Sequence, residues 1–310
     1  MRGRILVTPR SLTAGPDRAL LNPLEQAGYE LVLGPAGRQP SQAELIALLP
    51  GCVGYLAGVE PVSEDVIMSA DVLRVISRNG AGIDSIDRRA AEARGIQVVR
   101  AAGSNARGVA ELALALILAG LRQLSFSDRA IRAGRWDRIR GREAAERVLG
   151  IVGYGAVGRT VASLAGAIGM SCVAYDPFVD ARTVNLGSVR LLASLDDVLG
   201  ASIAVTLHCP PSPSGQPLIG SREIDLMPRA SVLVNTARWS LVDPGAVVWA
   251  LDSGQLAAYA TDTFAVEPPV LDRLVMHERT ILTPHLGGFT DESVGRAAQA
   301  AVRNLLEALG

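Results

Sequence analysis

Val148-Leu149-Gly150-Ile151-Val152-Gly153-Tyr154-Gly155-Ala156-Val157-Gly158 is the stretch that decides the fold. It begins as an apolar run rich in β-branched residues, which is typical of a buried parallel strand. Gly153, Gly155 and Gly158 then give G-x-G-x-x-G before an apolar helical stretch to Ala167. In a dinucleotide site these glycines permit a tight turn, the approach of a pyrophosphate, and close packing of helix on strand. The helix N-terminus offers its N–H groups to the phosphates.

A second strand, expected at residues 171–176, ends in Asp176. An acid about twenty residues past the glycines is where a ribose-binding carboxylate is expected. Such a carboxylate accepts hydrogen bonds from the adenosine ribose and repels a 2′-phosphate, so the sequence favours NAD over NADP. Arg182, farther along the same loop, is the one residue that would soften this preference. The alternative is an ordinary strand–turn–helix unit without a nucleotide.

The length and composition predict a globular protein of two domains. The chain has 310 residues, of which 49% are hydrophobic and 20% charged, which is enough to bury a sizeable core. A net charge of −1 gives no electrostatic attraction to nucleic acid or to an anionic membrane, and we expect neither partner. Cys52, Cys172 and Cys209 have no paired spacing, which is typical of reduced thiols.

We expect a soluble, cytoplasmic protein. Residues 1–9 run straight into a strand without a signal-peptide core, and the longest apolar run, 112–121, is too short to cross a bilayer. The chain contains no lysine, which excludes a Walker A phosphate loop and Schiff-base chemistry. We predict no metal site, because His208, His277 and His285 lack ligand spacing with acids or cysteines.

The block before the glycine motif alternates short strands with helices. Alternation of this kind implies a parallel sheet with right-handed crossovers, hence a small α/β domain. We expect strands at 5–8, 30–33, 53–57, 73–77 and 96–100, and helices at 17–27, 42–49, 64–69 and 87–94.

Two loops in this part of the chain have features of a binding site. Residues 77–84 follow a strand, and their glycines can turn backbone N–H groups towards an anion. Residues 102–111 open a long helix to about Leu121, which Ser104 or Asn105 could cap. Ordinary turn glycines and a cap are the alternative. The helix from about Val109 is apolar on nearly all sides, so it lies in the core or at a subunit interface, and we favour the interface.

Polar residues recur just beyond the later strands, expected at 203–207, 231–235, 257–261 and 280–282, before a final helix at about 291–309. In an open parallel sheet that edge binds ligands. Arg238, Glu267 and His285 there could form one site, since arginine binds a carboxylate bidentately and histidine moves a proton. A carboxylate fixes the imidazole tautomer. With a nicotinamide cofactor they would transfer hydride to or from a hydroxy acid. Taken singly, Arg238 could instead form a surface ion pair, Glu267 could be an acid at the start of a helix, and His285 could be an ordinary loop residue.

These motifs together resemble the D-isomer-specific 2-hydroxyacid dehydrogenase family, and its phosphoglycerate-dehydrogenase-like members in particular. The similarity runs along almost the whole chain, and its last three motifs are specific. The matching stretches are 79–84, Asn105 with 109–111, the glycine motif, Asp176, Asn235-Thr236-Ala237-Arg238, Asp262-x-Phe264-x-x-Glu267-Pro268 and Thr283-Pro284-His285-Leu286-Gly287-Gly288.

The resemblance implies roles for particular residues. His285 would be the general acid/base, Glu267 its partner, and Arg238 the anchor of the substrate carboxylate and carbonyl. The substrate would further meet Asn79, Gly80, Ala81, Gly82 and Asn105, with Arg78 or Arg107 on a phosphate. NAD would meet Gly153, Tyr154, Gly155, Ala156, Val157, Gly158, Asp176, Pro177, His208, Cys209, Pro210, Thr236, Ala237, Arg238, Asp262, His285, Gly287 and Gly288.

The resemblance also implies two Rossmann-like or flavodoxin-like parallel-sheet domains. A discontinuous substrate-binding domain, 1–102 and 287–310, would enclose an inserted NAD-binding Rossmann domain, 103–286. The active site would lie in a cleft that closes by a hinge motion. A homodimer joined through the cofactor domains is expected, which suits the apolar helix.

One position departs from the family pattern, since Trp239 and Ser240 stand where two glycines are common. A positive φ there would strain Trp239, or its indole would narrow the cleft, or it would lie on the surface. The sequence predicts NAD-dependent interconversion of a D-2-hydroxy acid and its 2-oxo acid, with 3-phosphoglycerate as one candidate. The alternatives are glyoxylate or hydroxypyruvate reduction, an NAD-sensing corepressor-like protein, and an inactive enzyme remnant.

Overall fold

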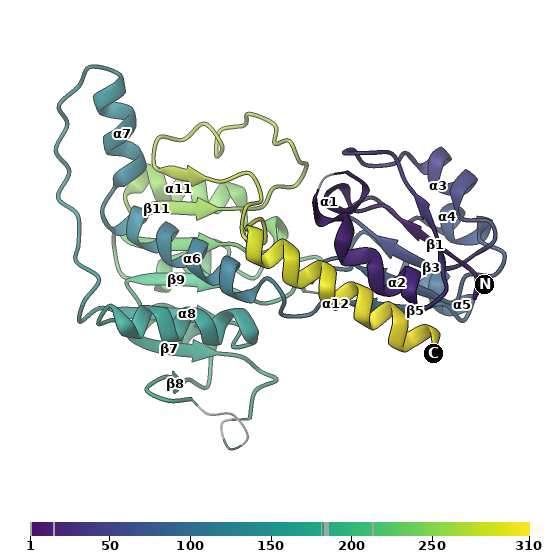
Figure 1. Cartoon of the computed structure of the whole chain (residues 1–310). Helices are drawn as coiled ribbons and strands as arrows, with labels where there is room; N and C mark the ends of the chain where they lie inside the picture. Colours follow the sequence, from purple (N-terminus) through teal and green to yellow (C-terminus); the bar gives the residue numbers. More distant parts are fainter. Residues whose placement is uncertain (1, 15, 181, 183–185, 213) are drawn as a thin grey trace. The chain divides into compact units, whose positions relative to one another are not determined.

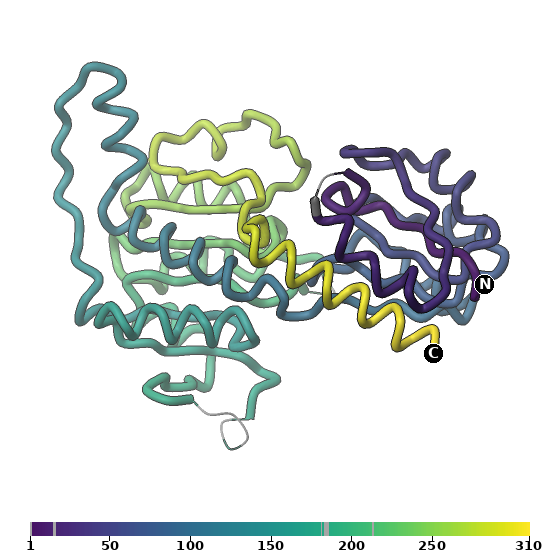
Figure 2. The backbone as a smooth tube through the Cα atoms, viewed as in Figure 1, coloured from purple at the N-terminus to yellow at the C-terminus, as the bar shows by residue number. Residues whose placement is uncertain are grey.

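The computed structural model describes residues 2–14, 16–180, 182, 186–212 and 214–310. The chain divides into two compact units, and Figures 1 and 2 colour the chain by residue number from purple to yellow. Unit 1 consists of Met1–Asn105 and Gly288–Gly310, and unit 2 of Ala106–Gly287. The division falls at 105 rather than the expected 102, and at 287 rather than 286.

Unit 1 is built on a five-stranded parallel sheet with the order β2-β1-β3-β4-β5. This is the flavodoxin-like order, in which the chain reverses direction across the sheet between β1 and β3. The strands are β1 (Arg4–Val7), β2 (Glu30–Leu33), β3 (Cys52–Ala57), β4 (Val75–Arg78) and β5 (Gln97–Arg100).

Helices cover both faces of the sheet in unit 1. Two buried clusters lie on opposite sides, one including Leu305 of the C-terminal helix and the other Leu45. The Ser77 hydroxyl on β4 donates a buried 2.7 Å hydrogen bond to the Ala301 carbonyl, which ties the end of the chain to its beginning. The helices are α1 (Arg10–Thr13), α2 (Asn22–Gln26), α3 (Gln42–Leu48), α4 (Glu64–Ser69), α5 (Arg88–Ala93) and α12 (Asp291–Leu309).

One expected helix of unit 1 is broken in two. In place of a helix at 17–27, the chain forms the 3-10 helix η1 (Pro16–Leu21) followed by α2. Pro23 lies in the first turn of α2. Proline has no N–H and clashes with the preceding turn, so it is tolerated only where a helix begins. The expectation of one continuous helix was therefore wrong.

Unit 2 is built on a seven-stranded parallel sheet with the order β12-β11-β10-β9-β6-β7-β8. Counted from β6, this is the 3-2-1-4-5-6 order of a dinucleotide-binding fold with one further strand, and the order reverses between β6 and β9. The strands are β6 (Val148–Val152), β7 (Ser171–Tyr175), β8 (Arg190–Leu191), β9 (Ala204–Leu207), β10 (Ser231–Asn235), β11 (Leu256–Thr261) and β12 (Thr280–Leu282). The predicted α/β class with two parallel sheets is confirmed.

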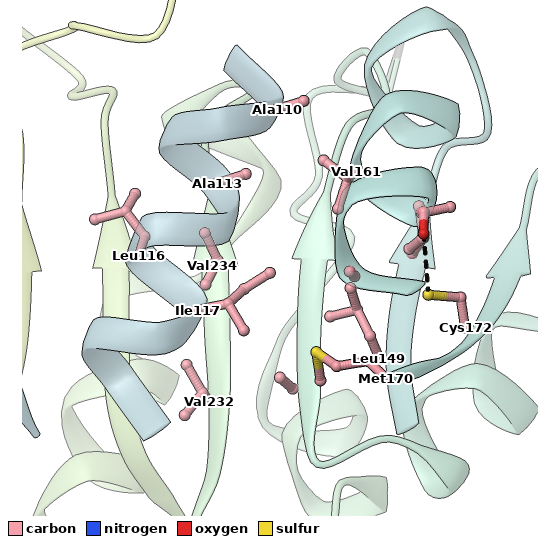
Figure 3. Packing of buried hydrophobic residues seen from close by; sticks show 14 of the residues in the cluster. Ala110, Ala113, Leu116, Ile117, Leu149, Val161, Met170, Cys172, Val232 and Val234 are labelled. Carbon is pink, nitrogen blue, oxygen red and sulfur yellow. Dashed lines mark hydrogen bonds between the residues drawn. The ribbon is translucent and has the colours of Figure 1, made fainter. Parts of the chain in front are cut away.

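Helix α6 (Ala106–Leu121) packs in the core of unit 2. Figure 3 shows Ala113 and Ile117 of α6 among the buried apolar side chains, with Val232 and Val234 of β10 close by. A Cβ on Gly120 would lie 2.6 Å from Val232 Cγ1, so this glycine lets the helix approach the strand. The core alternative thus holds for the buried face of α6, while contact of its outer face with a second copy stays a prediction.

The remaining helices of unit 2 divide between the two faces of the sheet. Helix α8 (Ala156–Ala167) packs beside α6, and α9 (Leu195–Ala201), α10 (Ser221–Leu226) and α11 (Pro244–Ser253) contribute to the cluster on the opposite face. Within the described ranges no single helix has the length and apolar character to cross a membrane. Helices α6 and α7 (Leu124–Arg132) have sufficient length and apolar character only when taken together, and this pair is bent by 64°.

Candidate active site

Three of the predicted site residues follow three adjacent strands of unit 2. Arg238 lies after β10, Glu267 after β11 and His285 after β12, and these strands are neighbours in the sheet. Because the strands are parallel, their carboxyl ends meet at one edge, and the three loops rise from it together.

His285 and Glu267 form a hydrogen-bonded pair. Nδ1 of His285 lies 2.9 Å from both Oε1 and Oε2 of Glu267. A carboxylate only accepts hydrogen bonds, so Nδ1 carries the proton and Nε2 is left for a reacting group. The side chains are 54% and 42% exposed. An ion pair this exposed contributes little to stability, so its geometry matters for chemistry rather than for folding.

Asp262 holds the loop that carries His285. This residue is buried, and its carboxylate accepts hydrogen bonds from the Thr283 hydroxyl at 2.6 Å, the Leu286 N–H at 2.7 Å and the Gly287 N–H at 2.8 Å. His285 itself has a φ of 55°, in the left-handed region. Bonds on both sides of His285 keep this uncommon conformation in place. The sequence predicted cofactor contact for Asp262 but missed its support of the loop.

Arg238 is presented by a turn that Asn235 shapes. The buried Asn235 side chain accepts from the Ala237 N–H at 3.1 Å and donates to the Arg238 carbonyl at 2.8 Å. Nη1 of Arg238 donates to the Ala237 carbonyl at 2.8 Å. Thr236, predicted to lie along the cofactor, is buried in the same turn. The guanidinium is thus held at the edge of the sheet, where its planar fork suits a carboxylate.

Trp239 is not strained. It starts a 3-10 helix, η2 (Trp239–Leu241), and is not among the described residues with positive φ, so of the alternatives left open for this position the one with a strained backbone does not hold. Its indole stacks on Phe264, with ring centroids 5.9 Å apart and planes inclined by 29°. The Phe264 N–H in turn donates to Glu267 Oε1 at 3.3 Å. The stack therefore joins the loop of the arginine to the loop of the acid.

Each glycine of the G-x-G-x-x-G motif has the geometry its predicted role requires. Gly153 has a φ of 93°, and a Cβ on it would lie 2.7 Å from the carbonyl of His208. A Cβ on Gly158 would lie 2.1 Å from the Gly153 oxygen, because α8 packs tightly on the turn. Around Gly155 nothing lies within 4 Å of the Cβ position, so the backbone there is open to a ligand.

Asp176 lies against the same turn. Its Oδ2 accepts from the Tyr154 N–H at 2.8 Å and its Oδ1 from the Phe178 N–H at 2.9 Å. A carboxylate fixed beside the glycine-rich loop suits ribose hydroxyls and disfavours a 2′-phosphate. Arg182 forms an ion pair with Asp180, Nη2 to Oδ2 at 2.7 Å, so its charge is already engaged.

Residues after β9 complete the edge at the point where the strand order reverses. The His208 N–H donates to the Val152 carbonyl at 2.7 Å, and its Nε2 lies 3.0 Å from the Thr206 hydroxyl. Burial lowers the pKa of His208 to about 3 and raises the pKa of the Cys209 thiol to about 11. Both groups are neutral near pH 7, so neither competes with His285 as a proton carrier.

The predicted substrate residues are divided between the two units. In unit 1, the Asn79 N–H donates to the Ala57 carbonyl at 2.9 Å, and Gly80 has a φ of 147°. Arg78 turns back to donate to the Asn79 carbonyl. Arg107 belongs to unit 2 and pairs with Glu111 one helical turn away, with both side chains more than half exposed.

Two further observations on the described residues concern a metal site and a buried acid. No group of three His, Cys, Asp or Glu side chains there could hold a metal ion. A buried acid of unit 1, Glu60, was missed by the sequence analysis. The available signal was a lone acid within a mostly apolar stretch, just past the expected strand at 53–57.

Residues 114–287 match the family model described as D-isomer specific 2-hydroxyacid dehydrogenase, NAD binding domain. The chain belongs to this family. Its members are NAD-dependent oxidoreductases that act on CH–OH groups. The family and NAD as the cofactor are thereby confirmed, and the open backbone at Gly155 beside Asp176 fits that dinucleotide.

The chain is similar in sequence to curated D-3-phosphoglycerate dehydrogenases. The D-3-phosphoglycerate dehydrogenase of Methanocaldococcus jannaschii is 35% identical over 250 residues, which are 80% of this chain and 48% of the relative. The chain spans about half the length of the curated relatives it matches.

Solved structures match over nearly the full chain. A glyoxylate reductase from Paecilomyes thermophila superposes with a TM-score of 0.87 at 27% identity, covering 99% of this chain and 95% of its own. An NAD+-bound 3-phosphoglycerate dehydrogenase from Entamoeba histolytica gives 0.83 at 25% identity, covering 98% and 94%. These similarities leave the substrate open between a phosphorylated and an unphosphorylated acid.

Alanine at two glycines should separate cofactor binding from folding. Gly155→Ala adds a methyl group in open space at a residue with a φ of −76°, so the melting temperature should hold while NADH affinity falls about tenfold or more. Gly158→Ala forces the backbone apart and should destabilise unit 2 by several kcal/mol, about the cost of overpacking. Thermal melts and NADH titrations measure both. Equal NADH affinity of Gly155→Ala and the wild type would contradict the placement of the pyrophosphate.

Proposed function

We propose that this chain is an NAD-dependent D-2-hydroxyacid dehydrogenase that interconverts a D-2-hydroxy acid and its 2-oxo acid. The observation that carries the proposal is the bond between His285 Nδ1 and the Glu267 carboxylate, on loops next to that of Arg238. A base held by an acid beside a carboxylate-binding arginine is what proton transfer to a 2-oxo acid requires.

The chain's residues would divide the reaction as follows. NADH, when bound, supplies a hydride to C2 of the 2-oxo acid. Protonated His285 donates from Nε2 to the carbonyl oxygen, so that one hydride and one proton add across the C=O bond. Arg238 holds the carboxylate and stabilises the charge that develops on the oxygen. In oxidation, neutral His285 takes the hydroxyl proton, and Glu267 stabilises the imidazolium that forms.

Two substrate classes are supported by different relatives. The name D-3-phosphoglycerate dehydrogenase of the sequence relatives favours 3-phosphoglycerate. The structural match to a glyoxylate reductase favours glyoxylate or hydroxypyruvate. A substrate-binding role for unit 1, a homodimer and a cytoplasmic location belong to the same proposal and stay predictions.

Oxidation of NADH with a panel of 2-oxo acids tests the proposed function. Glyoxylate, hydroxypyruvate, pyruvate, oxaloacetate and phosphohydroxypyruvate are compared, with NADPH in parallel. We expect turnover of at least one acid and slower turnover with NADPH, because Asp176 repels the 2′-phosphate. Tight NADH binding without turnover of any acid would contradict the proposed dehydrogenase activity and favour a corepressor-like sensor or an inactive enzyme remnant.

A further inference from the structure

The sheet of unit 1 has its own point of reversal, between β1 and β3, both labelled in Figure 1. In open parallel sheets, ligands bind beyond the carboxyl ends of the strands at such a point. Thr8 follows β1 and Gly58 follows β3, and the two are hydrogen-bonded, Gly58 N–H to Thr8 Oγ1 at 3.2 Å. The place where the topology favours a ligand in this unit is therefore defined by these two residues.

The carboxylate of Glu60 lies at this place. Its Oε1 accepts from the Tyr55 hydroxyl at 2.6 Å, from the Gly58 N–H at 2.8 Å and from the Thr8 hydroxyl. The residue is 1% exposed. Three donors on one oxygen fix the carboxyl group rigidly at the junction of the two strands, which is the pattern of a positioned acceptor rather than of a surface acid.

The second oxygen of Glu60 has no hydrogen-bond partner within the part of the chain that the structure describes. Oε2 is buried, and Oδ1 of Asn79, at the end of the neighbouring strand β4, is a second buried acceptor in the same condition. Buried acceptors nearly always have a partner, so these two lack a donor that a ligand or water would bring. Oε2 also lies 2.5 Å from the Cβ position of Gly58, so that any larger residue there would displace it.

Glu60 and Asn79 lie at the same edge of the sheet. The Asn79 N–H donates to the carbonyl of Ala57, the residue before Gly58, which ties the end of β4 to the end of β3. Asn79 also opens the loop 79–82, which the family resemblance assigns to the substrate carboxylate. A substituent on C3, the carbon bonded to the keto carbon, could reach this edge from a carboxylate held on the loop.

We propose that Glu60 and Asn79 form a subsite for the C3 substituent of the substrate, one that takes a hydroxyl- or ammonium-bearing group and disfavours a phosphate ester. The inference rests on the proposed function and names its substrate class. A carboxylate with an unfilled acceptor is satisfied by a donor, whereas a phosphate brings like charge and no compensating hydrogen. The phosphorylated substrate in the names of several relatives is thus disfavoured for this chain.

Steady-state kinetics with three acids tests the subsite. Glyoxylate has no C3 and reports on the dehydrogenase reaction alone, whereas hydroxypyruvate and phosphohydroxypyruvate differ only in the phosphate. We expect the kcat/KM of the wild type to be about tenfold or more higher for hydroxypyruvate than for phosphohydroxypyruvate. Glu60→Gln keeps an oxygen for the three donors but loses the charge. It should lower kcat/KM for hydroxypyruvate about tenfold, the size of one charge-assisted hydrogen bond, and leave glyoxylate within about twofold.

Controls separate specificity from folding. Glu64→Gln, at an exposed acid in the first turn of α4, should leave all three acids unchanged. Gly58→Ala, whose Cβ would lie 2.5 Å from Oε2 of Glu60, should displace that oxygen and also lower hydroxypyruvate turnover selectively, which gives a second test should Glu60→Gln melt early. A wild type that prefers phosphohydroxypyruvate, or an equal loss on glyoxylate and hydroxypyruvate in a stable Glu60→Gln variant, overturns the subsite alone. No turnover of any of the three acids, with NADH bound, overturns the proposed function itself.

Discussion

Substitution of His285 by asparagine is expected to lower kcat by about 10²- to 10⁴-fold, the usual contribution of a general acid–base group. The physical reason is that the variant lacks a nitrogen that can both donate and accept a proton at Nε2. Asparagine suits the test better than alanine, because residue 285 has a φ of 55° and asparagine tolerates the left-handed region. Steady-state kinetics on the best 2-oxo acid and an NADH titration give the readout, with cofactor affinity expected to stay near the wild-type value.

The exposure of the pair supplies the control for that experiment. His285 and Glu267 are 54% and 42% exposed, so the melting temperature of His285→Asn should match the wild type. Glu267→Gln keeps a hydrogen-bond acceptor for Nδ1 but no charge, and should lose less activity than His285→Asn. An asparagine variant with near-normal kcat, or one that no longer binds NADH, would show that His285 is not the proton carrier.

Much of the fold could be predicted because it depends on local patterns. The glycine motif, the apolar run before it and Asp176 lie within one short stretch, and their spacing is set by the geometry of a single strand–helix–strand unit. Alternation of strands and helices likewise implied parallel sheets. The order of the strands in each sheet could not be predicted, because the periodicity of apolar residues does not say which strands are neighbours. The discontinuous substrate domain came from the family resemblance.

The residues of the candidate site could be predicted from the sequence, but the contacts that hold them in place could not. Arg238, Glu267 and His285 were singled out because each follows a strand, and the sheet does place their three loops side by side. The contacts that hold them were not predicted. Asp262 binds a loop more than twenty residues away, and Trp239 stacks on Phe264 across two strands. Such contacts depend on side-chain packing between distant segments, which no local pattern encodes.

The error at residues 17–27 has a local cause, whereas the omission of Glu60 has a tertiary one. Pro23 was visible in the sequence and its missing N–H decides where α2 begins. Glu60, in contrast, is unusual only because Tyr55, Thr8 and Gly58 surround one of its oxygens and leave the other buried. Tyr55 and Gly58 are close to Glu60 in the chain, but Thr8 follows a different strand, β1, so the full set of donors and the burial of the other oxygen become visible only when the sheet is assembled.

Substitution of Arg238 by lysine is expected to lower kcat/KM for 2-oxo acids by about 10²- to 10³-fold, the cost of removing one well-placed donor to a developing oxyanion. Lysine keeps the positive charge but loses the planar fork that binds a carboxylate through two parallel hydrogen bonds. The Asn235 bonds that shape the turn go to backbone groups at 237 and 238, so the fold of the turn should survive. Kinetics on glyoxylate measure the effect, and Arg273→Lys, at an exposed arginine paired with Asp252, is the matched control. Activity of Arg238→Lys within about threefold of the wild type would mean that charge alone suffices at this position and that the carboxylate is anchored elsewhere.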